Sequence, residues 1–491
     1  MYSNTQSLLY EERYIKPLDI EYKFPHKKRN LLLIYMESFE NNYKNADFFG
    51  KNLIPNLEKL QNEGEFSNEH RSLPGADYSI AALVASQCAI PLRFNKNRDL
   101  WEAKFFLPGA LCVGDILKNN GYQTALVKAA DITFTNVNLF ALQHGYIEAS
   151  GVDEIKKDLG EEGFETKIGA FGGVRDRVLW DYAKSKLDKF DKDKPFMLTL
   201  FSLDTHGPTV FVDKDCKREF NDVRDAFMCA DRGVYEFIEW FKTSEYWDNT
   251  TVVIVGDHLM ATRMKGLEKD RNRGIYNVFL NLPKGLEIKK DKVFSTYDLA
   301  PSIIEALGGE INPRGFGLGR SMFSDDKTLM EDIGRQQFRT RLMQKTLMYE
   351  EFTRPNVERV VNYKEYKMGD VIKGREFLEY TDSFVEALGR YYIDRMNVGI
   401  YDYKGGNLKG KLKFYAIMGY DSALIIYVND VKIKEFKFDR TIRQPFEVDF
   451  EIDSKLINDG KFVLKTRNSS GVSIEQALSI SPEELVFEEI K

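Results

Sequence analysis

Side chains that could do chemistry follow three apolar runs of the sequence. The runs are LLLIYM at 31–36, MLTLFSL at 197–203 and TVVIV at 251–255. The polar residues that follow them closely include Glu37, His206, Asp257 and His258. A single polar residue after a strand is usually a turn or cap residue, but these positions hold two of the chain's five histidines. Because functional groups of open α/β sheets gather beyond the carboxyl ends of the strands, we expect these four side chains to share one crevice.

A further segment, SLPGADYSIAALVASQCAIPL at 72–92, adds a serine hydroxyl. Pro74-Gly75 predicts a turn, and Asp77 is the expected N-cap of the helix that follows. Helical spacing with one buried side is shown by Ile80, Leu83, Val84 and Gln87. Ser79 then lies in the first helical turn, where unpaired N–H groups and the helix dipole favour an anionic ligand such as phosphate. The alternative is an ordinary helix cap, for which serine is common.

Together these groups predict a metal-assisted reaction at phosphorus. Two carboxylates, an imidazole and a serine hydroxyl suit a divalent ion of the manganese, zinc or magnesium type. Coordination would lower the pKa of the Ser79 hydroxyl and make its alkoxide available near neutral pH. Ser79 would then be a nucleophile, and a phosphodiester would bridge the metal and the helix N-terminus. His206 could hold a non-bridging oxygen or protonate the leaving alcohol.

Alternating helix and strand patterns surround these residues. Helical periodicity runs over about 52–63, and 111–129 predicts a helix, a turn at Gly121 and a strand. The segment 295–301 leads into a helix that ends at Gly308-Gly309. This alternation predicts an α/β fold with a mostly parallel sheet flanked by helices.

The length of 491 residues suggests two or three domains. We expect a catalytic domain over 30–325, a helical and hairpin extension over 326–385, and a C-terminal β-sandwich over 386–491. Residues 1–29 are polar, aromatic and basic. They are expected to form a stalk or linker next to a membrane region that the printed chain lacks.

Composition narrows the classes of partner. With 70 basic and 76 acidic residues the net charge is −6, which gives no electrostatic reason to expect nucleic acid. The printed chain has no apolar run of about 18 residues and no signal peptide, so it is expected to be soluble by itself. Its four cysteines, Cys88, Cys112, Cys216 and Cys229, allow three pairings if all are bridged and match no zinc spacing. Buried free thiols are the alternative.

Several longer stretches of the sequence resemble one enzyme family. They are LLLIYMESFE at 31–40, SLPGADYSIAALVASQCAIPL at 72–92, CVGDILKNNGYQTALV at 112–127, SLDTHGP at 202–208, VIVGDHLMA at 253–261 and GLGRS at 317–321. On these stretches the chain resembles the phosphoglycerol transferases of the alkaline phosphatase and sulfatase superfamily, and more distantly the lipoteichoic acid synthases. The resemblance covers about 30–325, and the second stretch is long enough to be highly specific.

The resemblance implies roles for individual residues. The implied metal ligands are Glu37, Ser79, Asp257 and His258. Ser79 would attack phosphorus, and His206 would contact the phosphoryl group. The family more often has threonine at the position of Ser79. Lipoteichoic acid synthases have a Trp-Asn-Arg element in the glycerol pocket, and this chain has Phe134-Thr135-Asn136-Val137 in the similar place. The expected substrate-binding residues, besides His206, are therefore Lys128, Asp131, Asn136 and Thr262.

Two further features follow from the resemblance. It implies the disulfides Cys88–Cys112 and Cys216–Cys229, since an extracytoplasmic compartment permits bridging. Sulfatase activity itself is not expected. The run Ser79-Ile80-Ala81-Ala82-Leu83 lacks the proline and arginine of the Cys/Ser-x-Pro-x-Arg motif that is converted to formylglycine.

The function that the resemblance predicts is that of a periplasmic, metal-dependent transferase, anchored to the inner membrane in its full-length form. Manganese is the expected ion, with zinc or magnesium as alternatives. sn-Glycerol-1-phosphate would pass from phosphatidylglycerol, or from a phosphoglycerol-bearing glucan, to Ser79 and then to a glucan or another surface glycan. The alternatives are a phosphoethanolamine transferase or phosphodiesterase of the same superfamily. From another class, the rival is a glycan-binding protein in which the sandwich binds and the catalytic half has decayed.

Overall fold

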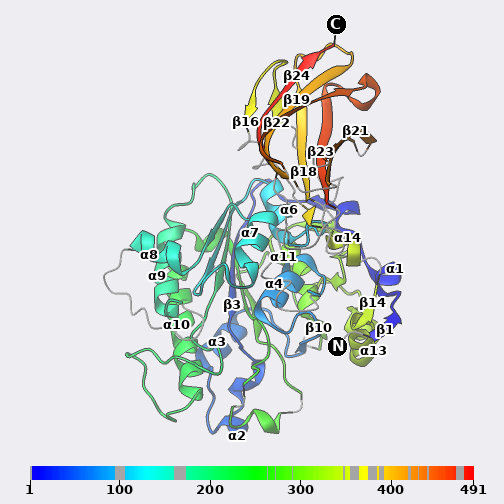
Figure 1. The fold of residues 1–491 in the computed structure, drawn as a ribbon. Coiled ribbons are helices and arrows are strands. Elements are labelled where there is room, and N and C mark those ends of the chain that lie inside the picture. The colour runs from blue at the N-terminus through cyan, green and yellow to red at the C-terminus, as the bar shows by residue number, and fades with distance from the viewer. Residues whose placement is uncertain are drawn as a thin grey trace. The chain divides into compact units, whose positions relative to one another are not determined.

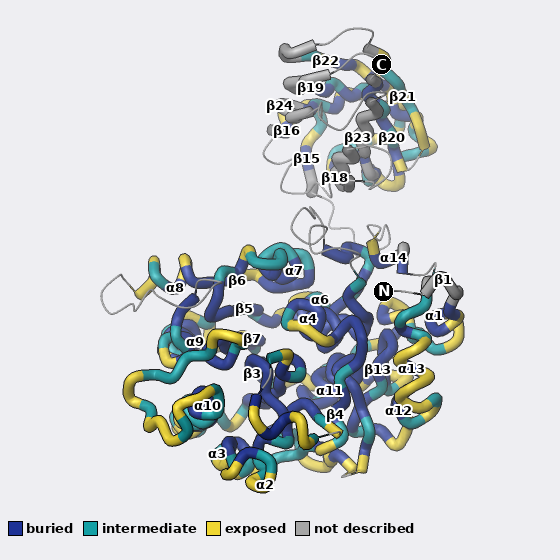
Figure 2. The backbone as a smooth tube through the Cα atoms, turned by 60° about the horizontal axis from the view of Figure 1, so that its bottom comes forward, coloured by how far each residue is buried: buried dark blue, intermediate teal, exposed yellow. Residues whose placement is uncertain are grey.

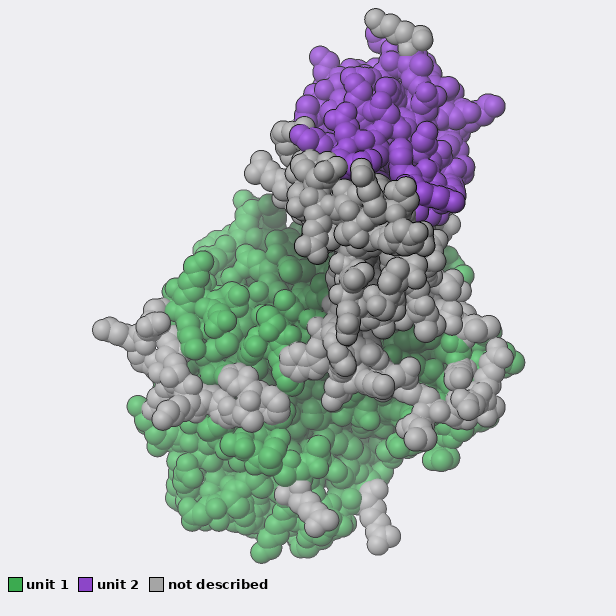
Figure 3. All heavy atoms as spheres, in the orientation of Figure 1, with its two compact units in different colours: residues 1–106, 110–350 green, residues 107–109, 351–491 purple. Residues whose placement is uncertain are grey.

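The computed structural model describes residues 3–93, 106–159, 173–262, 264–270, 272–289, 291–346, 349–353, 364–373, 384–385, 392–418, 422–429, 431–438, 442–470 and 480–490. The chain divides into two compact units, residues 1–106 with 110–350 and residues 107–109 with 351–491 (Figure 3). All of the residues predicted to bind metal or substrate belong to the first unit.

A six-stranded sheet of order β6-β5-β7-β3-β8-β9 runs through the first unit (Figure 1). Its strands are β3 (Asn30–Met36), β5 (Gln123–Lys128), β6 (Glu148–Ser150), β7 (Phe196–Phe201), β8 (Thr250–Gly256) and β9 (Asn277–Leu280). Strand β9 is antiparallel to β8, and the other neighbours are parallel. Every residue of β3, β7 and β8 is buried, as continuous apolar runs predict for strands covered on both faces.

Helices cover both faces of this sheet, and Figure 2 shows the buried strands between them. On one side lie α3 (Pro55–Glu63), α9 (Asp176–Leu187) and α10 (Arg224–Lys242); on the other lie α4 (Ser79–Cys88), α6 (Val113–Asn119) and α11 (Leu299–Ala306). Alternate side chains of β3 pack on opposite faces of the sheet. Leu32 and Ile34 share a core with α3, α9 and α10, whereas Tyr35 hydrogen-bonds Ser86 of α4. The predicted α/β fold class is confirmed.

The register of the sheet aligns the carboxyl ends of four strands. Met36 of β3 pairs with Gly256 of β8, and Phe201 of β7 pairs with both Tyr35 and Lys128. Residues that follow these strands therefore leave the sheet at one edge, where open α/β sheets place their functional groups.

Shorter elements complete the first unit. The helices are α2 (Ala46–Phe49), α7 (Val137–Gln143), α8 (Val152–Leu159), α12 (Leu329–Asp332), α13 (Arg335–Leu342) and α14 (Tyr349–Thr353), the last of which ends within the second unit. Short strands pair β4 (His70–Arg71) with β10 (Phe294–Ser295) and β12 (Gly315–Phe316) with β13 (Gly319–Arg320). None of the helices in the described part of the chain combines the length and the apolar character needed to cross a bilayer.

The N-terminal residues pack on the first unit instead of forming the predicted stalk. Strand β1 (Ser3–Gln6) pairs with β14 (Gln344–Lys345), and β2 (Glu21–Lys23) pairs with β11 (Glu310–Asn312). Helix α1 (Leu9–Arg13) buries Leu9 and Tyr10. The local polar pattern gave no sign of these pairings, because both partner strands lie far along the chain.

The second unit contains two β-sheets, of order β15-β18-β23-β20-β21, with β17 on β18, and β16-β24-β19-β22. The strands are β15 (Lys364–Tyr366), β16 (Ile372–Lys373), β17 (Phe384–Val385), β18 (Tyr392–Ile400), β19 (Leu408–Met418), β20 (Ser422–Val428), β21 (Val431–Phe438), β22 (Ile442–Ile452), β23 (Lys461–Ser470) and β24 (Ile480–Glu489). Pairing is antiparallel except between β15 and β18. Strands β15, β16 and β17 precede residue 386, so these sheets begin within the segment predicted as an extension.

Candidate active site

The carboxyl ends of β3 and β8 bring three potential metal ligands together. Glu37 follows β3, and Asp257 and His258 follow its parallel neighbour β8. His258 Nε2 lies 3.6 Å from Glu37 Oε1 and 3.4 Å from Asp257 Oδ2. One donor atom from each residue lies within 4.8 Å of the other two, which is close enough for the three to share one ion.

Ser79, the first residue of α4, joins this group. Its Oγ lies 3.4 Å from both Glu37 Oε2 and His258 Nε2. The N-cap of α4 is Tyr78, whose side chain does not cap the helix, and not Asp77 as predicted. Asp77 Oδ1 instead accepts a hydrogen bond from the backbone N–H of Gly75 within the preceding turn (3.2 Å). The helix thus begins without a side-chain N-cap, which leaves its first N–H groups available to an anion.

Neighbouring groups fix the orientation of the three ligands. The Ser38 N–H donates to Asp257 Oδ1 (2.8 Å), and Ser38 Oγ donates to Glu37 Oε1 (2.7 Å). Ser38 has a φ of +59°, a left-handed conformation that costs an L-residue about 1–2 kcal/mol and that is concentrated at functional sites. His258 Nδ1 lies 2.9 Å from the Leu259 carbonyl oxygen. In the neutral ring this contact keeps the proton on Nδ1 and leaves the Nε2 lone pair for a metal.

Without a cation, burial of these ionisable side chains costs folding free energy. Burial and the nearby Glu37 carboxylate raise the pKa of Asp257 to about 6. Burial lowers the pKa of His258, but attraction to Asp257 and Glu37 outweighs it and the net pKa rises to about 9. Asp257 Oδ2 is buried and has no hydrogen-bond partner among the described residues. A carboxylate oxygen that accepts no hydrogen bond, beside a second carboxylate and an imidazole nitrogen, fits a divalent cation.

A cavity of about 260 Å³ opens beside these residues. The predicted residues in its wall are Glu37, Ser79, Lys128, His206, His258 and Thr262. Burial lowers the pKa of His206, although the Asp257 carboxylate opposes the shift. Burial also lowers the pKa of Lys128 to about 8, against the attraction of Glu37. Imidazole and ammonium groups beside a hydroxyl nucleophile suit an anionic phosphoryl group.

Comparison with known proteins identifies the fold. The sequence model of the Sulfatase family matches residues 29–309, more than half of the chain, and this range contains every residue of the site. The chain belongs to the sulfatase family. The predicted membership of the alkaline phosphatase and sulfatase superfamily is thereby confirmed.

This sulfatase-family chain is also similar to curated bacterial proteins. It is 34% identical over 315 residues to phosphoglycerol transferase I of Salmonella agona, a match that covers 61% of this chain and 40% of that protein. It is 34% identical over 316 residues to phosphoglycerol transferase I of Citrobacter koseri, with the same 61% and 40% coverage. The chain thus spans about two fifths of the length of these relatives. The predicted resemblance to phosphoglycerol transferases is confirmed.

A solved structure supports the sulfatase-family fold. The chain is similar to a protein in the alkaline phosphatase superfamily from Vibrio parahaemolyticus, with a TM-score of 0.50 and 21% identity over 63% of this chain and 72% of that chain. At this identity the likeness concerns the fold alone.

Two of the predicted substrate-binding residues do not line the cavity. Asp131 Oδ1 accepts hydrogen bonds from the N–H and the hydroxyl of Thr133, both at 2.8 Å, and so shapes the turn after β5. Asn136 is the N-cap of α7, with a φ of +57°. Its neighbours Phe134 and Thr135 line the cavity instead. Their position just beyond the carboxyl end of β5 is the feature of the sequence that could have identified them. Which residues of the turn line the cavity depends on the path of its backbone.

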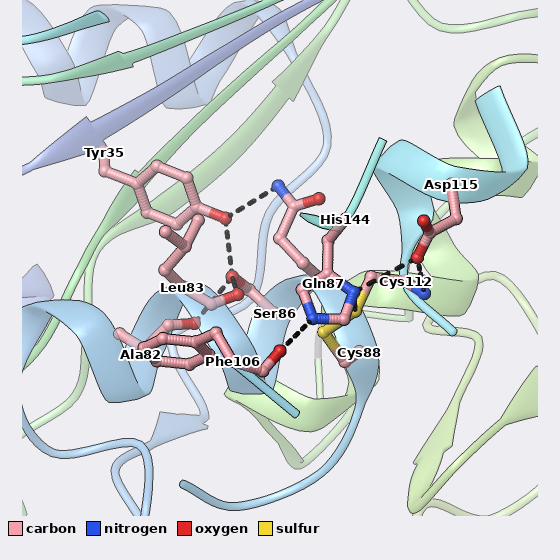
Figure 4. Close-up of a disulfide and its surroundings, with 10 residues drawn as sticks. All are labelled: Tyr35, Ala82, Leu83, Ser86, Gln87, Cys88, Phe106, Cys112, Asp115 and His144. Atoms are coloured by element: carbon pink, nitrogen blue, oxygen red, sulfur yellow. Dashed lines mark hydrogen bonds and ion pairs between the residues drawn. A yellow bond between two sulfur atoms is a disulfide. The ribbon is translucent and has the colours of Figure 1, made fainter. Parts of the chain in front are cut away.

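Two disulfides join the pairs that the resemblance implied, Cys88–Cys112 and Cys216–Cys229. The first links the last residue of α4 to the N-cap of α6, and Figure 4 shows it beside His144. His144 Nδ1 lies 3.2 Å from Asp115 Oδ2, and the Tyr35 hydroxyl lies 2.5 Å from Ser86 Oγ. The helix that carries Ser79 at its first position is thus anchored to α6 and to the sheet. Closing this loop contributes about 3 kcal/mol.

Proposed function

We propose that this chain is a metal-dependent phosphotransferase that moves phosphoglycerol to a glycan through a covalent phosphoglyceryl-Ser79 intermediate. The observation that carries the proposal is the place of Ser79, whose Oγ lies 3.4 Å from Glu37 Oε2 and His258 Nε2 in the cavity wall. A hydroxyl among potential ligand atoms has the surroundings of an activated nucleophile. The 34% identity to proteins named phosphoglycerol transferase I supports phosphoglycerol as the transferred group.

Four residues would hold one divalent ion: Glu37, Ser79, Asp257 and His258. We propose manganese, with zinc and magnesium as alternatives. When bound, such an ion lowers the pKa of a coordinated hydroxyl and stabilises negative charge on phosphoryl oxygens. The protein's own contribution is to fix the donor atoms, through the hydrogen bonds of Ser38 to both carboxylates and the contact between His258 Nδ1 and the Leu259 carbonyl oxygen.

The first step forms the bond between Ser79 Oγ and the donor phosphorus and breaks the bond from phosphorus to the leaving alcohol. The serine proton passes to water, and the leaving oxygen gains one. His206, in the cavity wall, either delivers that proton or holds a non-bridging phosphoryl oxygen. In the second step a glycan hydroxyl oxygen forms a bond to the same phosphorus, and the bond from phosphorus to Ser79 Oγ breaks. The glycan hydroxyl loses its proton to water, and Ser79 Oγ regains one. One cavity serves donor and acceptor in turn.

The donor that we propose is phosphatidylglycerol or a phosphoglycerol-bearing glucan, and the acceptor is a glucan or another surface glycan. Lys128 would attract the phosphoryl charge, and Thr262 would contribute a hydroxyl from the same wall. We place this reaction in the periplasm, with the full-length protein anchored to the inner membrane. The two disulfides are compatible with such a compartment.

Mass spectrometry of the manganese-loaded protein after exposure to a slow phosphatidylglycerol analogue tests the proposal. We expect a phosphoglyceryl adduct on the peptide that contains Ser79, and its loss in Ser79→Ala. Ser79→Thr is the matched variant, because it keeps a hydroxyl and should keep the adduct. A protein that binds manganese but forms no adduct on Ser79 would contradict the proposal.

The same experiment separates the alternatives. An adduct that forms only from a phosphatidylethanolamine analogue indicates a phosphoethanolamine transferase. Loss of the phosphoglyceryl group to water at one rate, with or without glycan, indicates a phosphodiesterase. Glycan binding without metal binding or an adduct indicates a glycan-binding protein.

A further inference from the structure

We propose that Asp176, the first residue of α9, is a positioning residue that sets the place of His206 in the cavity wall. The inference rests on the proposed function, in which His206 meets the phosphoryl group. Asp176 does not line the cavity, whereas His206 does. It therefore acts through the segment that joins β7 to His206.

Asp176 holds this segment by its backbone. Asp176 Oδ1 accepts hydrogen bonds from the N–H groups of Leu203 (2.7 Å) and Asp204 (3.3 Å). The Asp176 N–H in return donates to Asp204 Oδ2 at 3.2 Å. The His206 N–H donates to the Leu203 carbonyl oxygen at 2.9 Å. The position of His206 thus depends on a residue that Asp176 holds directly.

The other side of the segment is bound to Glu37. Ser202 Oγ accepts a hydrogen bond from the Glu37 N–H (2.9 Å), and Thr205 Oγ1 donates to the Glu37 carbonyl oxygen (2.6 Å). The segment is therefore held between a potential metal ligand and α9. Losing the contact with Asp176 loosens the Leu203 end of the segment, while the two bonds to Glu37 remain.

The contact buries two carboxyl groups that face each other. Asp176 and Asp204 are only 4% and 6% exposed. Burial, together with the facing Asp204 carboxylate, raises the pKa of Asp176 well above its usual range. Arg175 offsets part of this cost, since its Nη1 lies 3.7 Å from Asp204 Oδ1. Burying two facing carboxyl groups costs folding free energy, so the position of the segment explains the pair better than stability does.

A double-mutant cycle in the full chain tests the inference. Asp176→Ala and Asp176→Asn are made with His206 present and in the His206→Ala background. Asp231→Ala is the matched control, because Asp231 is also buried and accepts hydrogen bonds from the N–H groups of Asn56 (3.2 Å) and Leu57 (2.8 Å) in α3. Helix α3 contributes no residue to the cavity wall. The control thus removes a similar contact away from His206.

Two readouts are measured. The first is the rate of adduct formation on Ser79 from the phosphatidylglycerol analogue with manganese. The second is the response of the His206 imidazole NMR signal to sn-glycerol 1-phosphate in the zinc-loaded protein. With only five histidines in the chain, the signals can be assigned by substitution.

We expect Asp176→Ala to lower the adduct rate about tenfold or more when His206 is present, and by less than about twofold in the His206→Ala background. Asp176→Asn should stay within about threefold of the wild type, because the amide oxygen still accepts both N–H groups. The His206 response to sn-glycerol 1-phosphate should weaken in Asp176→Ala and persist in Asp231→Ala.

Equal losses from Asp176→Ala in both backgrounds, or an unchanged His206 response, would overturn the inference and leave the proposed function standing. A wild-type protein that forms no adduct and shows no His206 response would overturn both.

Discussion

The Thr205 hydroxyl donates a hydrogen bond to the backbone carbonyl oxygen of Glu37 over 2.6 Å, and both residues are buried. The bond joins the ends of β7 and β3 at the edge where the chain leaves the sheet. It therefore links the segment that carries His206 to a potential metal ligand.

Thr205→Val removes this hydrogen bond and keeps nearly the same side-chain size. The buried Glu37 carbonyl oxygen then loses the bond, so the free energy of unfolding should fall by about 1–3 kcal/mol. Manganese affinity should also fall, because Glu37 loses one of the hydrogen bonds that hold it in place. Urea unfolding and calorimetric titration with manganese measure the two effects.

Thr124→Val is the matched control for this prediction. Thr124 Oγ1 also donates to a buried carbonyl oxygen, that of Gly145 at 2.6 Å, but at the amino end of β5. This variant should lose comparable stability and keep its manganese affinity. The prediction is wrong if the two variants bind manganese equally well.

Asp257→Asn should stabilise the metal-free protein and abolish its response to metal. Burial and Glu37 raise the pKa of Asp257 to about 6, so its charged form is disfavoured. The amide removes the charge, while its oxygen can still accept from the Ser38 N–H (2.8 Å) and the His258 N–H (2.7 Å). With chelator present, the variant should melt at a higher temperature than the wild type. Added manganese should raise the melting temperature of the wild type alone.

Lys128→Met should weaken donor binding more than it slows turnover. The Lys128 ammonium lies in the cavity wall, 5.5 Å from the centroid of the Phe134 ring. Without this charge, the KM for an anionic donor should rise about tenfold with a smaller change in kcat. The free energy of unfolding should rise slightly, because a buried charge is removed. Steady-state kinetics and urea unfolding check both effects.

Lys292→Met provides the contrast for this lysine. Lys292 is also buried, but its Nζ donates to the carbonyl oxygens of Ser324 (3.1 Å) and Asp326 (2.5 Å). This variant should lose stability and keep the KM. A KM that rises equally in both variants would argue against a role for Lys128 in binding.

The strand ends were predictable because their signal is local. A strand that is covered on both faces has a continuous apolar sequence, and Glu37 and Asp257-His258 follow such runs closely. Parallel pairing then brings residues distant in sequence to one edge of the sheet. The same reasoning placed His206 at that edge, and the helical spacing after residue 79 placed Ser79 at the start of α4. Lys128 was predicted only from the family resemblance.

Other features depend on contacts that no local pattern encodes. Asp176 acts on Leu203 and Asp204, which lie 27 and 28 positions later. Thr135 and Asn136 both have positive φ values, and this turn, not residue type, decides that Thr135 lines the cavity. Asp77 has the right residue type for a helix cap, but its carboxylate is bound within the preceding turn.

His70 should make the protein less stable in acid. His70 is fully buried, with Nε2 3.2 Å from Thr296 Oγ1 and its ring stacked on Phe294. Burial, aided by the charge of Arg71, lowers its pKa to about 3. In the unfolded chain its pKa is about 6.5. Between these values the unfolded state binds a proton that the folded state does not, so stability falls as the pH falls, by up to about 1.4 kcal/mol per pH unit.

His70→Gln removes this titration and keeps a polar side chain near Thr296. Well above pH 6.5 the histidine contributes no slope to the stability curve, so the two proteins should there show parallel pH dependence. Below pH 6.5, the free energy of unfolding of the wild type should fall more steeply with pH than that of the variant. Down to pH 3 the two slopes should differ by the amount that one bound proton contributes. Urea unfolding at a series of pH values measures the difference. Identical slopes in the acid range would mean that the folded protein protonates His70 as readily as the unfolded chain does.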